Sequence, residues 1–429
     1  MQDLLGKYRD TGCMNDYFQQ PQMDDLIYYI MLCCVCKKTN CAKIGKDMPQ
    51  CFAAVGTKKQ KGYRVMKKER LLQRFFQYIT CSSESLRERE FCLMMEDELR
   101  TLGITVQRQE IGEPIGSNGW NIHAMLPGTG EPLLLCAHLD TALPGKGIVP
   151  TVRGGTVYSE GDTVLGADSK AGIAAVMEAL QTIVESSMPH RPVELLLTLC
   201  GENDLLGSRF TDQRTLTAAE AVVLTGDPLG YVGDRGAACV KYRFEIKGAG
   251  ARTGNLPETG VHALRTAADC VTRLRCGHVL PDSVVGIANL LCPGQTGTVP
   301  ARASFEVAIC SYDEEELRAL SDEAVQTVET TCAEQGAQCT SERSCVAPAY
   351  RIPADAPLLR RVCRGLTELG YAPAIGQPLR CSDAAWLAEG GRTAIEIGVG
   401  VQNAHSCGEH ILFEDIALTT ELLLKLLTE

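Results

Sequence analysis

The stretch Leu133-Leu-Leu-Cys-Ala-His138-Leu-Asp140-Thr141 carries both a strand and a candidate site. Its first five residues are all apolar, which is typical of a strand buried on both faces of a parallel sheet. A histidine and a carboxylate follow at once, and in open α/β sheets ligands bind beyond the carboxyl ends of the strands. An imidazole suits a divalent transition metal, and a neighbouring carboxylate can orient the ring. A histidine and an aspartate at this spacing are a weak signal by themselves.

A second polar segment lies thirty residues downstream, in Leu165-Gly-Ala-Asp168-Ser-Lys170-Ala-Gly172. It comes directly before an amphipathic helical pattern, so the carboxylate of Asp168 lies in a glycine-bounded loop from which it can reach a site beyond the sheet. The alternative is an Asp that caps the helix beside a solvated Lys, which is a common arrangement.

Around these two segments, short apolar runs alternate with helical patterns. This alternation predicts an α/β fold in which a mixed, mostly parallel sheet is flanked by helices. The expected strands are 133–137, 193–199, 221–224 and 393–399, and the expected helices are 70–80, 85–102, 173–184 and 416–427.

The pattern changes to alternating strands between residues 235 and 345. We expect strands at 241–246 and 303–309 and helices at 261–274 and 314–334 there. This order of elements indicates an inserted α+β domain. The α/β domain would then consist of residues 66–234 and 346–429.

Residues 1–65 differ in composition from the rest of the chain. They hold no Glu, ten Lys and Arg, six Asp and six of the cysteines, so their net charge is +4 against −15 for the remainder. We interpret them as a disordered extension or as the result of a start codon assigned too early. A metal site at Cys33, Cys34, Cys36 and Cys41 is the weaker alternative, because no second Cys pair or His pair completes it.

The overall composition excludes several classes of partner. The chain has 429 residues and a net charge of −11, and it shows no basic footprint for nucleic acid or an anionic membrane. Its longest apolar run, residues 26–36, is about half of the ~20 residues that a membrane helix needs. The odd and scattered set of 21 cysteines argues against a disulfide framework and favours a cytoplasmic protein.

Several blocks in order resemble a known family, the co-catalytic zinc exopeptidases and deacylases. That family includes peptidase T, carboxypeptidase G, acetylornithine deacetylase and succinyl-diaminopimelate desuccinylase, and the peptidase T-like branch is the most similar. The resemblance covers about residues 66–429. The blocks are SEGDTVLGADSKAGIAAVMEAL at 159–180, GENDLLGS at 201–208, SDAAW at 382–386 and GVGVQNAHSCGEH at 398–410.

The resemblance implies a site with two zinc ions bridged by one Asp and a water. His138 corresponds to a ligand of one zinc ion and Asp140 to the carboxylate that orients it. Asp168 corresponds to the bridging carboxylate, and His405 to the ligand of the other zinc ion. Two such ions lower the pKa of a shared water and polarise a peptide carbonyl. Mn or Co would also suit these donors.

One departure from the family pattern concerns Glu202. The family has two consecutive Glu residues, a general base and then a metal ligand, whereas this chain has one. Aligned on the preceding strand, Glu202 is the base and Asn203 replaces the ligand, with Asp204 as a substitute ligand. Aligned on the following Leu-Leu-Gly, Glu202 is the ligand and Gly201 stands where the base is expected.

Other departures affect a metal ligand and the oxyanion contact. The family Asp at the end of strand 221–224 is Thr225 here, and Asp227 is a shifted candidate ligand. In the inserted domain, Arg252 occupies the position of the family His that stabilises the oxyanion, and an Arg could bind an oxyanion or a substrate carboxylate. Glu409 matches a frequent family Glu after the ligand His405, and its neighbour His410 is interpreted as a helix-entry or surface position.

Two functions follow from the resemblance and its departures. The first is a zinc-dependent exopeptidase of the tripeptide aminopeptidase type, acting on short peptides or a related N-acyl amino acid, with a possible homodimer through the inserted lid or dimerisation domain. The alternative is a degenerate member that keeps the fold and acts as a binding or scaffold protein. The four retained residues His138, Asp140, Asp168 and His405 favour the enzyme.

Overall fold

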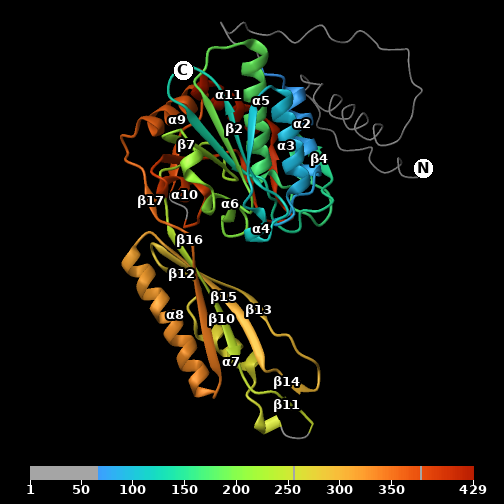
Figure 1. Ribbon diagram of the computed structural model, residues 1–429, viewed down its shortest axis with the longest axis vertical. Coiled ribbons are helices and arrows are strands. Elements are labelled where there is room, and N and C mark those ends of the chain that lie inside the picture. Colours follow the sequence, from blue (N-terminus) through green and yellow to red (C-terminus); the bar gives the residue numbers. More distant parts are fainter. Residues whose placement is uncertain (1–65, 255–256, 377–378) are drawn as a thin grey trace, which may run out of the picture. The chain divides into compact units, whose positions relative to one another are not determined.

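The computed structural model describes residues 66–254, 257–376 and 379–429. The expectations for residues 1–65, including the cysteines at 33–41, lie outside this part of the chain. Within it, the chain forms a large mixed sheet covered by helices and a smaller antiparallel sheet with two helices of its own (Figure 1). The α/β fold class predicted from the sequence is confirmed.

The central sheet of the described residues has eight strands in the order β1-β2-β6-β3-β7-β19-β8-β18. Its middle strands β6, β3, β7 and β19 run parallel to one another. These are the apolar runs of the sequence, and β3 and β6 are buried along almost their whole length. The strands are β1 (Thr105–Gln109), β2 (Asn121–Leu126), β3 (Leu133–His138), β6 (Val193–Thr198), β7 (Glu220–Thr225), β8 (Tyr231–Gly233), β18 (Ala374–Gly376) and β19 (Thr393–Gly398).

Helices cover both faces of this sheet (Figure 1). The long α5 contacts β3 and β7 and also packs against α2 and α11. On the opposite face, α10 contacts β7 and β19. Leu134 and Cys136, alternate residues of β3, belong to the same apolar cluster as residues of α10. The helices are α2 (Lys68–Thr80), α3 (Arg89–Thr101), α4 (Gly112–Ile115), α5 (Ala167–Ser186), α6 (Leu206–Arg209), α9 (Pro357–Glu368), α10 (Asp383–Glu389) and α11 (Phe413–Thr428), with a 3-10 turn at Gln213–Thr215.

A four-stranded sheet in the order β20-β21-β5-β4 supports the C-terminal part of the candidate site. The segment that carries His405 connects β20 to β21, which pair with each other, and β21 also pairs with β5. The strands are β4 (Pro150–Arg153), β5 (Thr156–Ser159), β20 (Val401–Gln402) and β21 (His410–Leu412). The sequence pattern did not predict these short strands.

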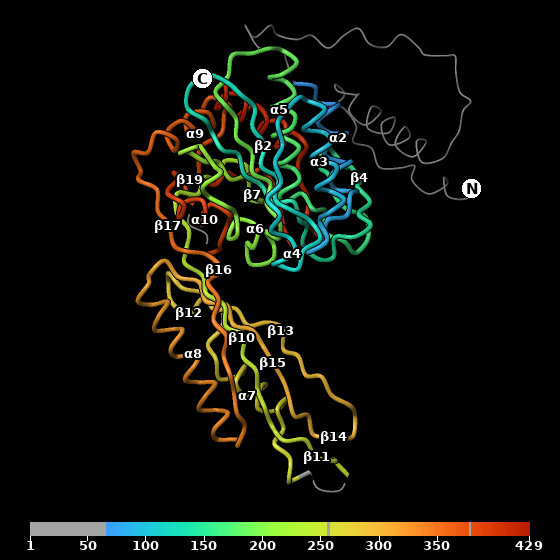
Figure 2. Tube along the Cα trace, viewed as in Figure 1, coloured from blue at the N-terminus to red at the C-terminus, as the bar shows by residue number. Residues whose placement is uncertain are grey.

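The second large sheet is antiparallel, in the order β12-β13-β15-β10-β16. The chain enters it along β10 and leaves along β16, which is paired with β10 (Figure 2). Alternate residues of β10 and β15 are buried and pack with α7 and α8, which gives a core on one face. The elements are β10 (Ala238–Lys247), α7 (Ala263–Arg273), β12 (Gly277–Leu280), β13 (Ser283–Leu291), β15 (Arg302–Ser311), α8 (Glu314–Glu334) and β16 (Gln338–Ala347).

The remaining elements of the described residues are short. The expected domain limits at residues 235 and 345 fall in β9 and β16, and β9 pairs with β17. These pieces are β9 (Arg235–Gly236), β11 (Ala251–Arg252), a 3-10 turn (Pro257–Thr259), β14 (Thr298–Val299) and β17 (Tyr350–Arg351).

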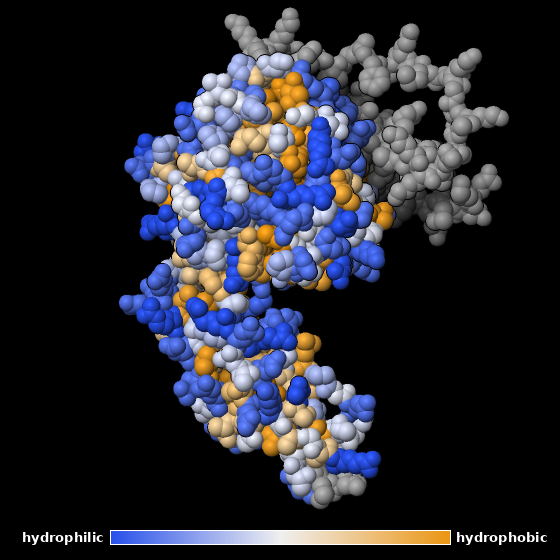
Figure 3. All heavy atoms as spheres, viewed as in Figure 1, coloured by the Kyte–Doolittle hydropathy of each residue, from blue (hydrophilic) through white to orange (hydrophobic). Residues whose placement is uncertain are grey.

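The surface of the described residues is mixed. Hydrophilic side chains cover most of the face in Figure 3, with smaller apolar areas between them. Among the helices of the described residues, none combines the length and the apolar character needed to cross a bilayer. All fifteen cysteines of these residues are free thiols.

Candidate metal centre

The site forms where three neighbouring parallel strands end. His138 is the last residue of β3, Gly201 and Glu202 follow β6 by three and four residues, and Thr225 is the last residue of β7. Because these strands lie in the order β6-β3-β7, their carboxyl ends meet at one edge of the sheet.

Asp140 holds the ring of His138 in place. The Nδ1 atom of His138 lies 3.1 Å from Oδ1 of Asp140, which leaves Nε2 free to face the cavity. Asp140 is fully buried and also accepts a 2.6 Å hydrogen bond from the hydroxyl of Ser85. Burial alone would raise the pKa of Asp140, but these hydrogen bonds and the His138 charge lower it. Asp140 therefore lies where the sequence places an orienting carboxylate.

Asp140 and Glu88 also fix the backbone that carries Glu202. The amides of Gly201 and Glu202 donate to Oδ1 and Oδ2 of Asp140 at 2.7 and 3.1 Å. The preceding amide, of Cys200, donates to Oε1 of Glu88 at 3.2 Å. Three successive amides are thus held by two buried carboxylates, and the Glu202 side chain leaves from a fixed backbone.

A buried carboxylate likewise holds the loop of Asp168. The Oε2 atom of Glu409 accepts the amides of Leu165 and Gly166, each at 3.1 Å, and Oε1 accepts those of Ala167 and Asp168 at 2.7 and 3.2 Å. Glu409, the family Glu after the ligand His in the resemblance, is buried, with only 2% of it exposed. Four otherwise unpaired amides at the start of α5 explain why a carboxylate is buried there.

Four side chains meet at the strand ends. The two oxygens of Asp168 face different histidines, Oδ1 lying 3.3 Å from Nε2 of His138 and Oδ2 lying 3.4 Å from Nε2 of His405. Glu202 repeats this arrangement, with Oε2 at 3.0 Å from Nε2 of His405 and Oε1 at 4.0 Å from Nε2 of His138. Each carboxylate therefore lies between the two imidazole rings.

The carboxylates of this group stabilise positive charge on both imidazole rings. Burial would lower the pKa of His138, but Asp140 and Asp168 raise it well above its usual value. Hydrogen bonds to Asp168 and Glu202 raise the pKa of His405 to about 10. The two imidazolium charges in turn hold the pKa of Asp168 far below its usual range, although burial opposes this.

The donor set also fits a metal ion. His138, Asp168 and Glu202 offer ligand atoms that all lie within 4.8 Å of one another. The Oε1 atom of Glu202 is buried and has no hydrogen-bond partner. A buried carboxylate oxygen without a partner is costly, and a metal ion would supply the missing contact.

Two glycines let the backbone approach these ligands closely. A Cβ atom on Gly201 would lie 2.5 Å from Cβ and Cγ of His138, and one on Gly226 would lie 2.3 Å from Cγ of Asp168. A residue with a side chain at position 201 would therefore displace His138. In the alignment that makes Glu202 the metal ligand, the absent first Glu of the family pair falls on Gly201, where this backbone leaves no room for a side chain.

Two of the predicted site residues lie away from this group. Asp227 accepts a 2.7 Å hydrogen bond from the hydroxyl of Thr225 and forms an ion pair with Arg380. Arg252 is exposed on β11, where it pairs with Thr298 of β14, and it does not line the cavity at the site.

Arg380 and Asp383 are two site residues that the sequence reasoning did not assign. They line a cavity of about 70 Å³ together with His138, Asp168, Ser169, Gly201, Glu202, Leu205, Val223, Leu224, Thr225, Cys381, Ser382 and His405. Asp383 is buried, burial raises its pKa, and its Oδ1 has no hydrogen-bond partner. The SDAAW block was the available signal, but nothing in it showed that these side chains reach the ends of β3, β6 and β7.

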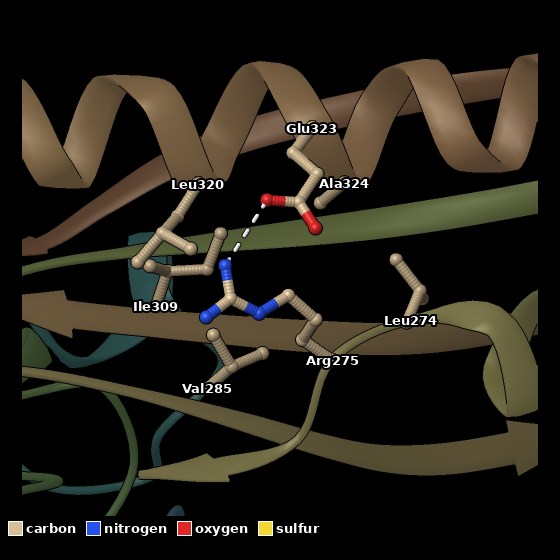
Figure 4. Close-up of a pocket in the computed structure, with 7 residues that line it drawn as sticks. All are labelled: Leu274, Arg275, Val285, Ile309, Leu320, Glu323 and Ala324. Atoms are coloured by element: carbon tan, nitrogen blue, oxygen red, sulfur yellow. Dashed lines mark hydrogen bonds and ion pairs between the residues drawn. The ribbon is translucent and has the colours of Figure 1, made fainter. Parts of the chain in front are cut away.

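Another hollow lies in the inserted domain, between α8 and the antiparallel sheet (Figure 4). It is lined mainly by aliphatic side chains and measures about 10 Å³. The guanidinium of Arg275 lies across it and reaches Glu323 at 3.4 Å. This space is too small for a substrate.

Comparison with known proteins gives a consistent result. Residues 134–429 match the family described as peptidase family M20/M25/M40. The chain is 25% identical to the uncharacterized protein YqjE of Bacillus subtilis over 370 residues, which cover 85% of this chain and 99% of that protein.

Two solved structures share the fold. The aminopeptidase PepT of Bacillus cereus is 27% identical with a TM-score of 0.71, over 85% of this chain and 98% of that one. A tripeptidase of Staphylococcus aureus is 24% identical with a TM-score of 0.76, over 85% of this chain and 99% of that one.

Proposed function

The chain belongs to peptidase family M20/M25/M40, and on that premise we propose that it removes the N-terminal residue from short peptides, tripeptides in particular. The resemblance to the peptidase T-like branch, the exopeptidase activity and the hydrolase class predicted from the sequence are confirmed by the family match and by the likeness to PepT. The choice of tripeptides is supported by the names of the two solved structures.

One observation supports the proposal that this activity depends on metal ions. Asp168 and Glu202 each direct one oxygen to His138 and the other to His405. Such an arrangement suits two divalent ions side by side, one near each imidazole, with Asp168 as the shared ligand. We favour zinc, because N and O donors of this kind bind it well, while Mn and Co would also suit them.

When bound, such ions would lower the pKa of a water toward ~7 and polarise the scissile carbonyl. Other residues of the protein hold the proposed metal ligands in position. Asp140 keeps Nδ1 of His138 occupied so that Nε2 faces the cavity, and Glu409 holds the loop of Asp168. Arg380, on the cavity wall, is paired with Asp227 and Glu396, so it would meet the carboxylate of a short peptide only when Asp227 leaves it for a metal ion.

The role of Glu202 follows from its contacts. It faces both imidazoles, so we assign it as a metal ligand, in the alignment that places Gly201 at the position of the family base. Substitution by Gln tests this assignment. If Glu202 is a ligand, Glu202→Gln lowers bound metal and kcat together, and added zinc partly restores both.

The opposite result identifies Glu202 as the proton acceptor. In that case Glu202→Gln would retain full metal content while kcat falls by about 10²–10⁴-fold. Glu113→Gln, exposed on α4 outside the cavity, is the matched control and should keep both metal content and kcat.

The remaining predicted residues have secondary roles in this proposal. Asp227 would complete the metal site only after leaving Arg380. Arg252 would contact the oxyanion or the substrate carboxylate if the inserted domain closes on the site or if a second copy supplies it. Gel filtration measures whether the chain is a homodimer, and the kinetics of an Arg252→Ala variant measure whether KM rises. A homodimer that supplies Arg252 to the site predicts both a dimeric mass and a raised KM in the variant.

The main experiment measures metal content and cleavage of a tripeptide panel on the same preparation. Two metal ions per chain and chelator-sensitive release of N-terminal residues would support the proposal. A folded protein with one metal ion or none and no cleavage would instead support the degenerate alternative. The free thiols fit a reducing compartment, and we infer a cytoplasmic location, which localisation of a tagged chain would test.

A further inference from the structure

Three thiol groups meet beside the candidate metal centre. Cys239 lies on β10, Cys310 on β15, and Cys381 in the loop that precedes α10. Their Sγ atoms all lie within 4.8 Å of one another, and those of Cys239 and Cys310 are 2.6 Å apart. The first two residues are directly opposite each other on paired antiparallel strands.

The surroundings of these thiols are apolar. Cys239 belongs to a buried cluster with Leu205, Val346, Ala347 and Ala385, and Cys310, Cys381 and Trp386 pack against it. Single buried cysteines in such a place would act as small apolar side chains. Three sulfur atoms in mutual contact, from three separate segments, form a set of soft ligands.

Hydrogen bonding already favours the ligand form at one of the three positions. The hydrogen bonds that Cys310 shares with Cys239 and Cys381 lower the pKa of its thiol, although burial opposes this. The thiolate is the form that binds metals.

We propose that Cys239, Cys310 and Cys381 form a binding site for a thiophilic divalent ion of the zinc type, separate from the His and carboxylate centre. Metal–sulfur bonds of about 2.3 Å place three ligand sulfurs ~4 Å apart, within the observed spread. The pair Cys239 and Cys310 would separate by about 1 Å, which rotation about the Cα–Cβ bonds provides. The thiol protons are released to solvent on binding.

The site has a direct connection to the cavity. Cys381 lies between Arg380 and Ser382, and all three line the cavity of the metal centre. An ion held by the three cysteines would join two strands of the inserted domain to the loop that carries Arg380. Its occupancy would therefore alter KM for short peptides more than kcat.

Cobalt binding to the full-length chain tests the proposal. Thiolate ligands give Co²⁺ an intense near-ultraviolet charge-transfer absorption, which His and carboxylate ligands do not give. The expected result is this absorption in the wild type and in Asp168→Asn, and its loss in Cys239→Ser and in Cys381→Ser. Cys363→Ser, a half-buried cysteine of α9 outside the cluster, is the matched control and should retain it.

Three results would overturn the proposal. The first is absence of the absorption in folded wild-type protein under reducing conditions. The second is its persistence in both Cys239→Ser and Cys381→Ser with circular dichroism spectra like that of the wild type. The third is an intact mass lower by two hydrogen atoms with a Cys239–Cys310 crosslink after purification with reductant, which would identify a disulfide pair instead. Because Asp168→Asn retains the thiol ligands, failure of the peptidase proposal leaves this test unaffected.

Discussion

Asp168 and Asp227, two carboxylates assigned to the metal centre, differ in the groups that they contact in the structure. Asp168 faces two imidazoles, and Glu409 holds its loop through four amides. Asp227 is instead paired with Arg380, a guanidinium that stays protonated at any ordinary pH.

This difference bears on the order in which the two metal ions bind. Imidazoles can lose their protons to make way for a metal ion, so the charge of Asp168 is available. The charge of Asp227 is balanced by a fixed cation of the protein itself. Asp168 is proposed as the ligand shared by both ions, so we expect the ion that would need Asp227 to bind second and more weakly. The following substitutions test this expectation.

The largest effect is expected from Asp168→Asn. The variant should lose bound metal, and kcat/KM should fall by about 10³-fold, the order that removal of a positioned charged group commonly costs. Metal analysis and tripeptide hydrolysis measure both quantities. Asp162→Asn, at an exposed position nearby in sequence, is the control and should behave like the wild type. Full metal retention in Asp168→Asn would contradict the assignment of this residue.

The next largest effect is expected from a change to Glu409, which holds the loop of Asp168. Glu409→Gln leaves one acceptor oxygen for four amides, so the free energy of unfolding should fall by about 2–3 kcal/mol. Urea titration measures this change. Glu414→Gln removes only an ion pair with Lys68 in which both side chains are nearly half exposed, and it should cost well under about 1 kcal/mol. Equal losses in the two variants would show that the amide contacts of Glu409 contribute little.

A smaller effect on metal binding and kcat/KM is expected from a change to Asp227. Asp227→Asn should retain the first metal ion, weaken the second, and lower kcat/KM by about 10²-fold or less. Isothermal titration with zinc resolves the two binding steps. Asp282→Asn, exposed in the inserted domain, serves as the control. Loss of both ions in Asp227→Asn would remove the distinction between the two carboxylates.

The smallest effect is expected at Asp415, which packs against Gly400 in the segment that leads to His405. Burial and the charge of Glu414 raise the pKa of Asp415 from 3.8 to about 6. Between these two values the folded chain binds more protons than the unfolded chain, so this group lowers stability as the pH rises from about 4 to about 6.

Asp415→Asn should therefore be more stable than the wild type at pH 7, with the gain disappearing below about pH 4. The side chain is only half buried, which reduces the expected gain to about 1 kcal/mol. Thermal unfolding from pH 4 to 8 measures it, with Asp322→Asn, exposed on α8, as the control. A pH-independent difference would exclude the proposed cause.

The sequence predicted the elements with strong periodicity better than the short ones. The apolar runs became β3, β6, β7 and β19, and the helix expected at 314–334 is α8. The short strands β8 and β18 have three residues each, and no pattern of alternation can develop over that length.

Residues at the site divide in a similar way. His138, Asp140, Asp168 and His405 belong to blocks that the sequence displays directly, and they converge in the structure. The sequence indicated no role for Glu409, because a Glu after a His carries no local sign of its partners, which are amides more than 240 residues away.

The apolar runs of the sequence by themselves determined an α/β fold with His and carboxylate donors after buried strands, and the resemblance to a known family implied a peptidase. That information is local, since a run of apolar residues and the residue that ends it are neighbours in the chain. Only the tertiary structure decided that Glu202 faces both histidines, that Arg380 forms an ion pair with Asp227, and that three cysteines distant in sequence meet. These facts depend on the order of strands in the sheet and on the return of the chain from the inserted domain, which no local pattern encodes.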